Sequence, residues 1–205
     1  MPNAHPCFFY GSLMDPRVLN AVTRPEADAE HYSVRASISG FIRHPYHNQP
    51  YPGIIPVDDP SRTVNGILVF GHSDLERHRL DQFEGSEYPR SVQKVQILDP
   101  VPAKYAAAVV HSSDNQHQHH HHHHHHHQGD DMTPAGTVLE AYAYVFEGPL
   151  EHLDRTREWD FAAFQRENCA RWISASPDFA TMIERSTIPL SSSSVSVTVL
   201  SSVQA

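Results

Sequence analysis

The chain has few basic residues and no long hydrophobic run. In its 205 residues, 15 lysines and arginines stand against 24 aspartates and glutamates, which gives a formal net charge of -9. A nucleic-acid partner is not expected, because binding to a phosphate backbone depends on an excess of basic side chains. No segment approaches the roughly eighteen consecutive apolar residues of a membrane-spanning helix, so no membrane partner is expected either.

Cysteine is also scarce. Cys7 and Cys169 stand far apart and outside any C-x-x-C arrangement, which excludes a disulfide framework or a thiolate zinc site and favours two packed thiols. Met1 to Pro6 contain no arginine or lysine, and the apolar run after them is too short for the core of a signal peptide. We therefore expect a cytoplasmic protein.

The length and the hydrophobic content of 39% suit one globular domain with tails. We expect residues 1–185 to form this domain and residues 186–205, which are rich in serine and valine, to be a disordered tail. The segment 111–137 is expected to be a disordered insertion, because its histidine-rich sequence cannot bury apolar surface.

Nine consecutive histidines, His119 to His127, lie inside this insertion. Clustered imidazoles bind nickel, zinc or copper, but a specific site needs ligands at fixed geometry and partners that orient them. We expect adventitious, weak metal binding here, with several ions per chain and no effect on activity. No specific metal site is expected elsewhere.

Many strands and few helices, in no regular alternation, favour an α+β fold with a curled sheet or barrel over a doubly wound sheet. A capping box, Ser73 to Glu76, begins one helix that should end at Gly85, and Asp160 can cap a final helix. The prolines between residues 45 and 56 predict a loop. Strands are expected at residues 7–10, 34–42, 64–70, 91–98, 105–110 and 138–146, and a short helix at residues 17–22.

The segment Tyr10-Gly11-Ser12-Leu13 follows a buried strand and precedes a helix start at Asp15. Such a loop directs backbone amides into one concave place, and the positive end of the helix dipole adds to their attraction for an anion such as a carboxylate. Gly11 would permit a positive φ and the close approach of a ligand, while Ser12 could add a hydroxyl contact. The alternative is an ordinary junction between a strand and a turn.

Glu84 is a candidate general acid/base. It falls in the last turn of its helix, where the dipole is negative, and Asp81 adds like charge from one turn earlier. Burial beside Phe83 would disfavour the charged form further, so the pKa of Glu84 should be raised toward neutrality, as proton transfer at neutral pH requires. The alternative is a solvated surface glutamate. Asp81 and Glu87 are weaker candidates for this role and are expected rather to be helix-capping or surface charges.

Several segments of the chain follow one another in an informative order and spacing. They are Phe9-Tyr10-Gly11-Ser12-Leu13-Met14, Tyr51-Pro52-Gly53-Ile54-Ile55-Pro56, Val64-Asn65-Gly66-Ile67-Leu68, Leu80-Asp81-Gln82-Phe83-Glu84-Gly85, Glu87-Tyr88-Pro89-Arg90, Ala141-Tyr142-Ala143-Tyr144-Val145-Phe146 and Glu158-Trp159-Asp160-Phe161. Together they resemble the AIG2-like branch of the γ-glutamylcyclotransferase superfamily. The resemblance covers Cys7 to about Trp172 and leaves out the histidine-rich insertion and the tail.

The resemblance implies a small mixed β-barrel flanked by helices and an intramolecular acyl transfer that releases 5-oxoproline from a γ-glutamyl compound, without metal or organic cofactor. It implies Glu84 as the proton acceptor and donor. It places Tyr10, Gly11, Ser12 and Leu13 in the substrate loop and aromatic side chains at the positions of Tyr88 and Tyr144 near the pocket. Either tyrosine could equally be a core residue with a satisfied hydroxyl.

The identity of residue 13 concerns the choice of substrate. Superfamily enzymes that act on γ-glutamyl amino acids tend to have asparagine at this position, whereas this chain has Leu13. The substrate, including a role in glutathione metabolism, stays open. A second reading is a non-catalytic module that keeps the same fold and binds a small ligand or a protein. A serine hydrolase built on Ser12 is disfavoured, because Met14 stands where a nucleophile elbow needs glycine.

Overall fold

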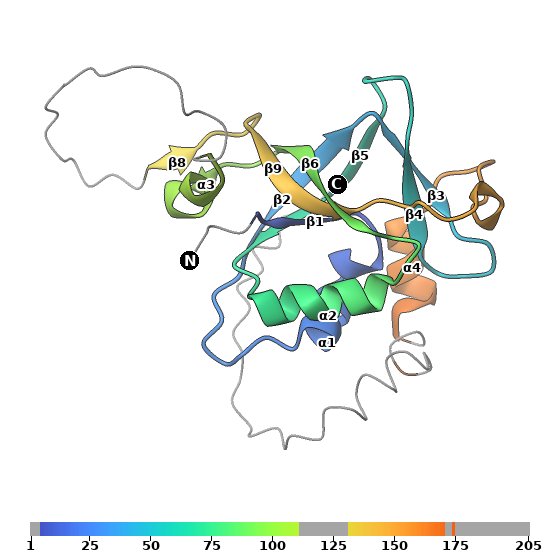
Figure 1. Cartoon of the computed structure of the whole chain (residues 1–205), viewed down its shortest axis with the longest axis horizontal. Helices are drawn as coiled ribbons and strands as arrows, with labels where there is room; N and C mark the ends of the chain where they lie inside the picture. Colours follow the sequence, from blue (N-terminus) through green and yellow to red (C-terminus); the bar gives the residue numbers. More distant parts are fainter. Residues whose placement is uncertain (1–4, 111–130, 171–173, 175–205) are drawn as a thin grey trace, which may run out of the picture.

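The computed structural model describes residues 5–110, 131–170 and 174. Its centre is a closed five-stranded barrel with the strand order β1-β5-β2-β6-β9 (Figure 1). The barrel strands are β1 (Cys7–Phe9), β2 (Tyr32–Ser39), β5 (Thr63–Phe70), β6 (Arg90–Ile97) and β9 (Val138–Tyr144). Together with its flanking helices, this barrel confirms the expected α+β class.

The barrel is mixed because one of its strand pairs is parallel. β1 runs antiparallel to β5, with Phe8 opposite Leu68, and parallel to β9, with Phe8 opposite Ala143. The other pairs, β2 with β5, β2 with β6 and β6 with β9, are antiparallel. The short, fully buried β1 is therefore held on both edges, and the chain that follows it leaves from a fixed point of the barrel wall.

Two helices pack together beside the barrel, below it in Figure 1. Helix α1 (Pro16–Thr23) begins with the Asp15 carboxylate accepting the Arg17 amide, and α2 (Asp74–Glu84) begins with the expected capping box of Ser73 and Glu76. Helix α2 ends at Gly85. Helix α4 (Phe161–Glu167) is capped by Asp160, as predicted. The final helix was expected to reach Trp172, which lies outside the described residues.

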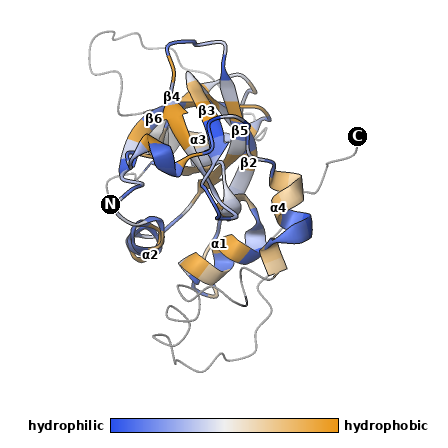
Figure 2. Ribbon diagram, turned by 90° about the vertical axis from the view of Figure 1, so that its right-hand side faces the viewer, coloured by the Kyte–Doolittle hydropathy of each residue, from blue (hydrophilic) through white to orange (hydrophobic). Residues whose placement is uncertain are grey.

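The proline-punctuated segment is a loop only over residues 46–51, and its remainder belongs to a β-hairpin, which corrects the sequence-based expectation. Strand β3 (Phe41–Pro45) pairs antiparallel with β4 (Pro52–Pro56), and Pro45 lies opposite Pro52. In a two-stranded sheet each strand is an edge, so prolines at strand ends remove no essential ladder bond. Figure 2 shows hydrophobic residues on β3 and β4 as well as on the barrel. The strand expected at residues 34–42 is split at Gly40, whose φ of +77° turns the chain.

The segment expected as a strand at residues 105–110 is helix α3 (Ala103–Val110), so that expectation was wrong. Ala103, Ala106, Ala107 and Ala108 are strong helix formers, and their propensity outweighs the apolar pattern on which the strand was predicted. The short strands β7 (Val101–Pro102) and β8 (Met132–Thr133) pair beside it. Because β8 lies within residues 111–137, the end of the expected insertion is a strand, while the histidine run and the tail lie outside the described residues.

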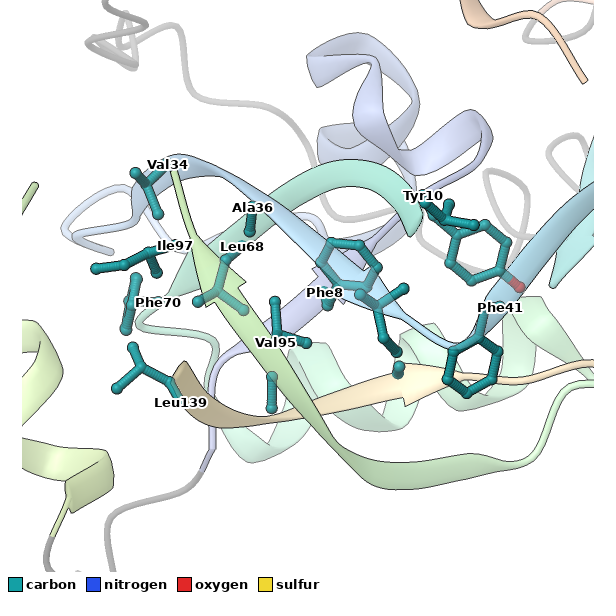
Figure 3. Packing of buried hydrophobic residues seen from close by; sticks show 14 of the residues in the cluster. Phe8, Tyr10, Val34, Ala36, Phe41, Leu68, Phe70, Val95, Ile97 and Leu139 are labelled. Carbon is teal, nitrogen blue, oxygen red and sulfur yellow. The ribbon is translucent and has the colours of Figure 1, made fainter. Parts of the chain in front are cut away.

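The barrel interior is filled by apolar side chains, among them Phe8, Leu68 and Val95 (Figure 3). A second apolar cluster lies between the barrel and its helices and includes Val18, Leu80 and Trp159. Tyr10 and Phe41 stand at one end of the interior in Figure 3, which is the end where the chain leaves β1. No helix of the described chain combines the length and apolarity needed to cross a membrane.

Candidate active site

A pocket of about 250 Å³ opens where the chain leaves β1 and where α2 ends. All seven residues placed at or near a site from the sequence line this one pocket: Tyr10, Gly11, Ser12, Leu13, Glu84, Tyr88 and Tyr144. The other lining residues are Phe8, Phe9, Tyr51, Pro52, Phe83, Gly85, Ser86 and Glu87. The two distant segments of the sequence therefore meet in space.

The loop after β1 forms a single 3₁₀ turn, η1 (Ser12–Met14). Its first two hydrogen bonds run from the Met14 amide to the Gly11 carbonyl and from the Asp15 amide to the Ser12 carbonyl. The amides of Ser12 and Leu13 precede these bonds, so the turn itself does not use them. A loop that lines a pocket and carries such amides can hold a carboxylate oxygen.

Gly11 does not have a positive φ, contrary to the expectation. Its φ is -121°, and the space around it is tight: a Cβ at Gly11 would lie 3.0 Å from Cδ of Pro52, so the Pro52 ring would have to shift. The N-terminus of α1 is also not free for a ligand, because the Asp15 carboxylate caps it. The anion site of this loop would therefore rest on the η1 amides and not on the dipole of α1.

Two polar contacts fix the loop. The Nη1 atom of Arg43, on β3, donates a 2.7 Å hydrogen bond to the Tyr10 carbonyl. Behind the loop, Asp15 is almost fully buried and accepts two 2.9 Å bonds from the guanidinium of Arg17 and one of 3.0 Å from Nε2 of Gln165. The pKa of Asp15 is lowered to about 2, because these hydrogen bonds outweigh the effect of burial.

Glu84 is the last residue of α2 and faces the pocket. Burial, and to a smaller extent the neighbouring charge of Asp81, together raise its pKa to about 8. Its backbone position at the negative end of α2 acts in the same direction. A carboxyl group with such a pKa can both accept and donate a proton near neutral pH.

Three tyrosines surround the carboxylate and differ in how their hydroxyls are used. The Tyr10 hydroxyl donates a 2.5 Å bond to the Tyr144 carbonyl, and the Tyr144 hydroxyl donates a 2.8 Å bond to Asp81. The Tyr88 hydroxyl is buried and has no hydrogen-bond partner among the residues that the structure describes. Burial raises the pKa of all three tyrosines, so their hydroxyls keep their protons.

A polar network at the pocket wall was not predicted from the sequence. Glu87, expected rather as a cap or surface charge, lines the pocket, accepts a 3.1 Å bond from the Tyr46 hydroxyl and lies 2.8 Å from Nδ1 of His152. Its place in the segment Glu87-Tyr88-Pro89-Arg90, which carries part of the family resemblance, was the available signal. Tyr46 and His152 come from other parts of the chain, and no motif marks them.

The pocket does not have the composition of a serine hydrolase site. Ser12 is buried in its wall, but none of the lining residues is a histidine that could act as its base. The ionisable groups of the lining are two carboxylic acids, Glu84 and Glu87, and tyrosines. This arrangement suits proton transfer to and from an amine better than activation of a hydroxyl.

A closed mixed barrel that carries an amide-bearing loop and a helix-end glutamate beside one pocket is a γ-glutamyl cyclotransferase-like fold. The family model described as gamma-glutamyl cyclotransferase, AIG2-like, matches residues 7–130. The chain belongs to this family.

Several known proteins are similar to the chain. Protein AIG2 C of Arabidopsis thaliana is 35% identical over 98 residues, which cover 48% of this chain and 56% of that protein. AIG2-like protein C of the same plant is 36% identical over 96 residues, with 47% and 52% covered. The match thus spans about half the length of these curated relatives. A crystal structure of a glutathione-specific γ-glutamyl cyclotransferase from yeast aligns over 90% of each chain, with 14% identity and a TM-score of 0.42.

Proposed function

We propose that the protein is a γ-glutamyl cyclotransferase, which converts a γ-glutamyl compound into 5-oxoproline and a free amine. The observation that carries the proposal is the position of Glu84, whose pKa is raised to about 8, in the same pocket as the η1 loop. Membership of the gamma-glutamyl cyclotransferase, AIG2-like, family supports the same reaction class.

In the proposed reaction, the α-amino group of the substrate attacks its own γ-carbonyl carbon. A bond forms between this nitrogen and the carbonyl carbon, and Glu84 accepts the proton that the nitrogen loses. The bond between the carbonyl carbon and the leaving nitrogen then breaks, and Glu84 returns the proton to the leaving amine. The glutamate ends in its starting state, so the step balances without water or a redox partner.

The protein's main task in this reaction is to fold the substrate. Nucleophile and electrophile belong to one molecule, so holding the chain in a ring-like shape supplies much of the acceleration. The amides of Ser12 and Leu13 would hold the substrate's α-carboxylate, and the carboxylates of the pocket would attract its amino group. Proton transfer by Glu84 would add a factor of roughly 10² to 10⁴.

The test is a mass-spectrometric assay for 5-oxoproline with glutathione, γ-glutamyl amino acids and γ-glutamyl-ε-lysine. We expect product from the wild-type protein and a loss of at least about 10²-fold in the Glu84→Gln variant. Asp74→Asn is the matched control, because it makes the same change from acid to amide on α2 at a side chain that is 97% exposed. It should retain full activity.

The outcome also separates the enzyme from the binding module. A Glu84→Gln variant that turns over substrate at the wild-type rate would exclude Glu84 as the proton carrier. Absence of 5-oxoproline with every substrate, together with a thermal shift on adding one of them, would favour a module that only binds. The preferred substrate in the assay would define the substrate class, which the presence of Leu13 in place of asparagine leaves open.

A further inference from the structure

Three potential metal ligands converge at the end of α2 that lies away from Glu84. His31 lies in the connection between α1 and β2, His72 between β5 and α2, and Glu76 in the first turn of α2. None of the three lines the pocket described above. One ligand atom from each residue lies within 4.8 Å of the other two.

The distances are close to those of a coordination sphere. Nε2 of His31 is 3.0 Å from Oε1 of Glu76, and Nδ1 of His72 is 3.6 Å from the same oxygen. Around a tetrahedral zinc ion, bonds of about 2.0–2.2 Å place neighbouring ligand atoms about 3.3 Å apart. All three ligand atoms lie within 4.8 Å of one another, so side-chain rotations would bring them to bonding distance of one ion.

The environment of the His72 side chain is not explained by an ordinary ion pair. Its side chain is only 2% exposed, and neither ring nitrogen has a hydrogen-bond partner among the described residues. Its ring packs 4.7 Å from the ring of His31 and 5.9 Å from that of Phe9, between centroids. Buried polar atoms normally have partners, so the unpartnered Nδ1, which faces Oε1 of Glu76 at 3.6 Å, is available to bind an ion.

Glu76 is oriented for the same purpose. Its Oε2 atom accepts a 2.7 Å bond from the Ser73 amide, which completes the capping box. Nε2 of His31 lies 3.3 Å from this oxygen and 3.0 Å from Oε1, and Oε1 is also the oxygen that faces His72. The capping box thus acts as the outer contact that fixes a ligating carboxylate in many metal sites.

We propose that His31, His72 and Glu76 bind a divalent transition-metal ion of the zinc class. Two neutral imidazoles and one carboxylate suit zinc, and they leave a fourth position for water. The ion would join the α1–β2 connection to the end of β5 and the start of α2. Its effect would be to stabilise the fold around α2.

The test must first remove the competing histidine run. A full-length background variant carries glutamine in place of each histidine from His119 to His127, and zinc binding is measured by competition with a chromophoric chelator. We expect one equivalent of zinc per chain and an increase in Tm when zinc is added. Substituting His31→Gln or Glu76→Gln in this background should weaken zinc binding by at least about tenfold.

His78→Gln is the matched control, because His78 is exposed on the same helix and should leave zinc binding unchanged. Folding is not at issue for Glu76→Gln, since glutamine also serves in a capping box. Circular dichroism checks the fold of each variant. A background chain that binds no zinc, or that binds it equally well without His31 and Glu76, would overturn the proposal.

Discussion

The Tyr144 hydroxyl donates a 2.8 Å hydrogen bond to Oδ1 of Asp81, three residues before Glu84 on α2. The same oxygen lies 3.1 Å from Nε of Arg90, so Asp81 is held as an oriented anion by two groups from β9 and β6. Its charge contributes to the raised pKa of Glu84. A residue on the outer side of the site thereby adjusts the proton affinity of the residue inside it.

The activity should therefore depend on pH in a way that Asp81 controls. Because a proton acceptor must be ionised, kcat/KM should rise about tenfold per pH unit below pH 8 and level off above it, following the Glu84 pKa of about 8. Replacing Asp81→Asn removes the like charge and should move this limb down by roughly one pH unit. The measurement is a pH profile of kcat/KM for both proteins.

The substrate's own amine also titrates, but Asp81→Asn cannot alter the pKa of this amine in the free substrate. Asparagine keeps an oxygen that can accept the Tyr144 hydroxyl, so the contact survives. The exposed Asp74→Asn variant should show the wild-type profile. An unshifted limb in Asp81→Asn would mean that the limb belongs to another group.

Glu84→Gln should stabilise the protein at alkaline pH. In the folded state the pKa of Glu84 is about 8, against 4.5 for an ordinary glutamate, so the folded state binds more protons between these values. The stability that this group contributes is present below pH 4.5 and is lost as pH rises to 8. Urea unfolding should show equal stability at pH 4.5 and an advantage of roughly 1–3 kcal/mol for Glu84→Gln at pH 8. If the free energies of unfolding of the wild type and of Glu84→Gln changed in parallel between pH 4.5 and pH 8, this prediction would be wrong.

Much of the fold could be predicted from local patterns. The strand expected at residues 64–70 is β5 (Thr63–Phe70), and that at 91–98 is β6 (Arg90–Ile97). Both could be predicted because buried and exposed positions alternate along much of each strand. Helix α3 was missed because an alanine-rich apolar run satisfies helix and strand patterns equally. The β3–β4 hairpin was missed because the prolines indicated a loop, whereas the pairing of Pro45 with Pro52 depends on a strand partner.

The candidate site also has a part that could be predicted from local sequence and a part that could not. The loop and the glutamate were identified from two local motifs. The positive φ expected at Gly11 was wrong, and the close approach of Pro52, which comes from another strand, could not be predicted. The Glu87 network with Tyr46 and His152, and the cluster around His72, join residues far apart in sequence. Only the closure of the barrel and the packing of α2 bring such residues together.

Gly66→Ala should destabilise the barrel. A Cβ at Gly66 would lie 2.2 Å from the carbonyl oxygen of Phe9 and 2.8 Å from the ring of Phe8, so β1 and β5 would have to separate locally. We expect a loss of about 2 kcal/mol or more in the free energy of unfolding. The neighbouring Asn65→Ala, at an exposed position of the same strand, should change it by less than about 0.5 kcal/mol. Equal urea midpoints for the two variants would contradict this account.

Two tyrosine variants should separate binding from stability. Tyr88→Phe removes a buried hydroxyl that has no partner among the described residues, so the free energy of unfolding should stay equal or rise. If this hydroxyl donates to the bound substrate, KM should increase by about tenfold. Tyr10→Phe instead removes the 2.5 Å bond to the Tyr144 carbonyl and should cost about 1 kcal/mol of stability. Urea unfolding and steady-state kinetics on both variants measure the two effects, and a Tyr88→Phe protein with reduced stability and unchanged KM would show that its hydroxyl serves the core and not the substrate.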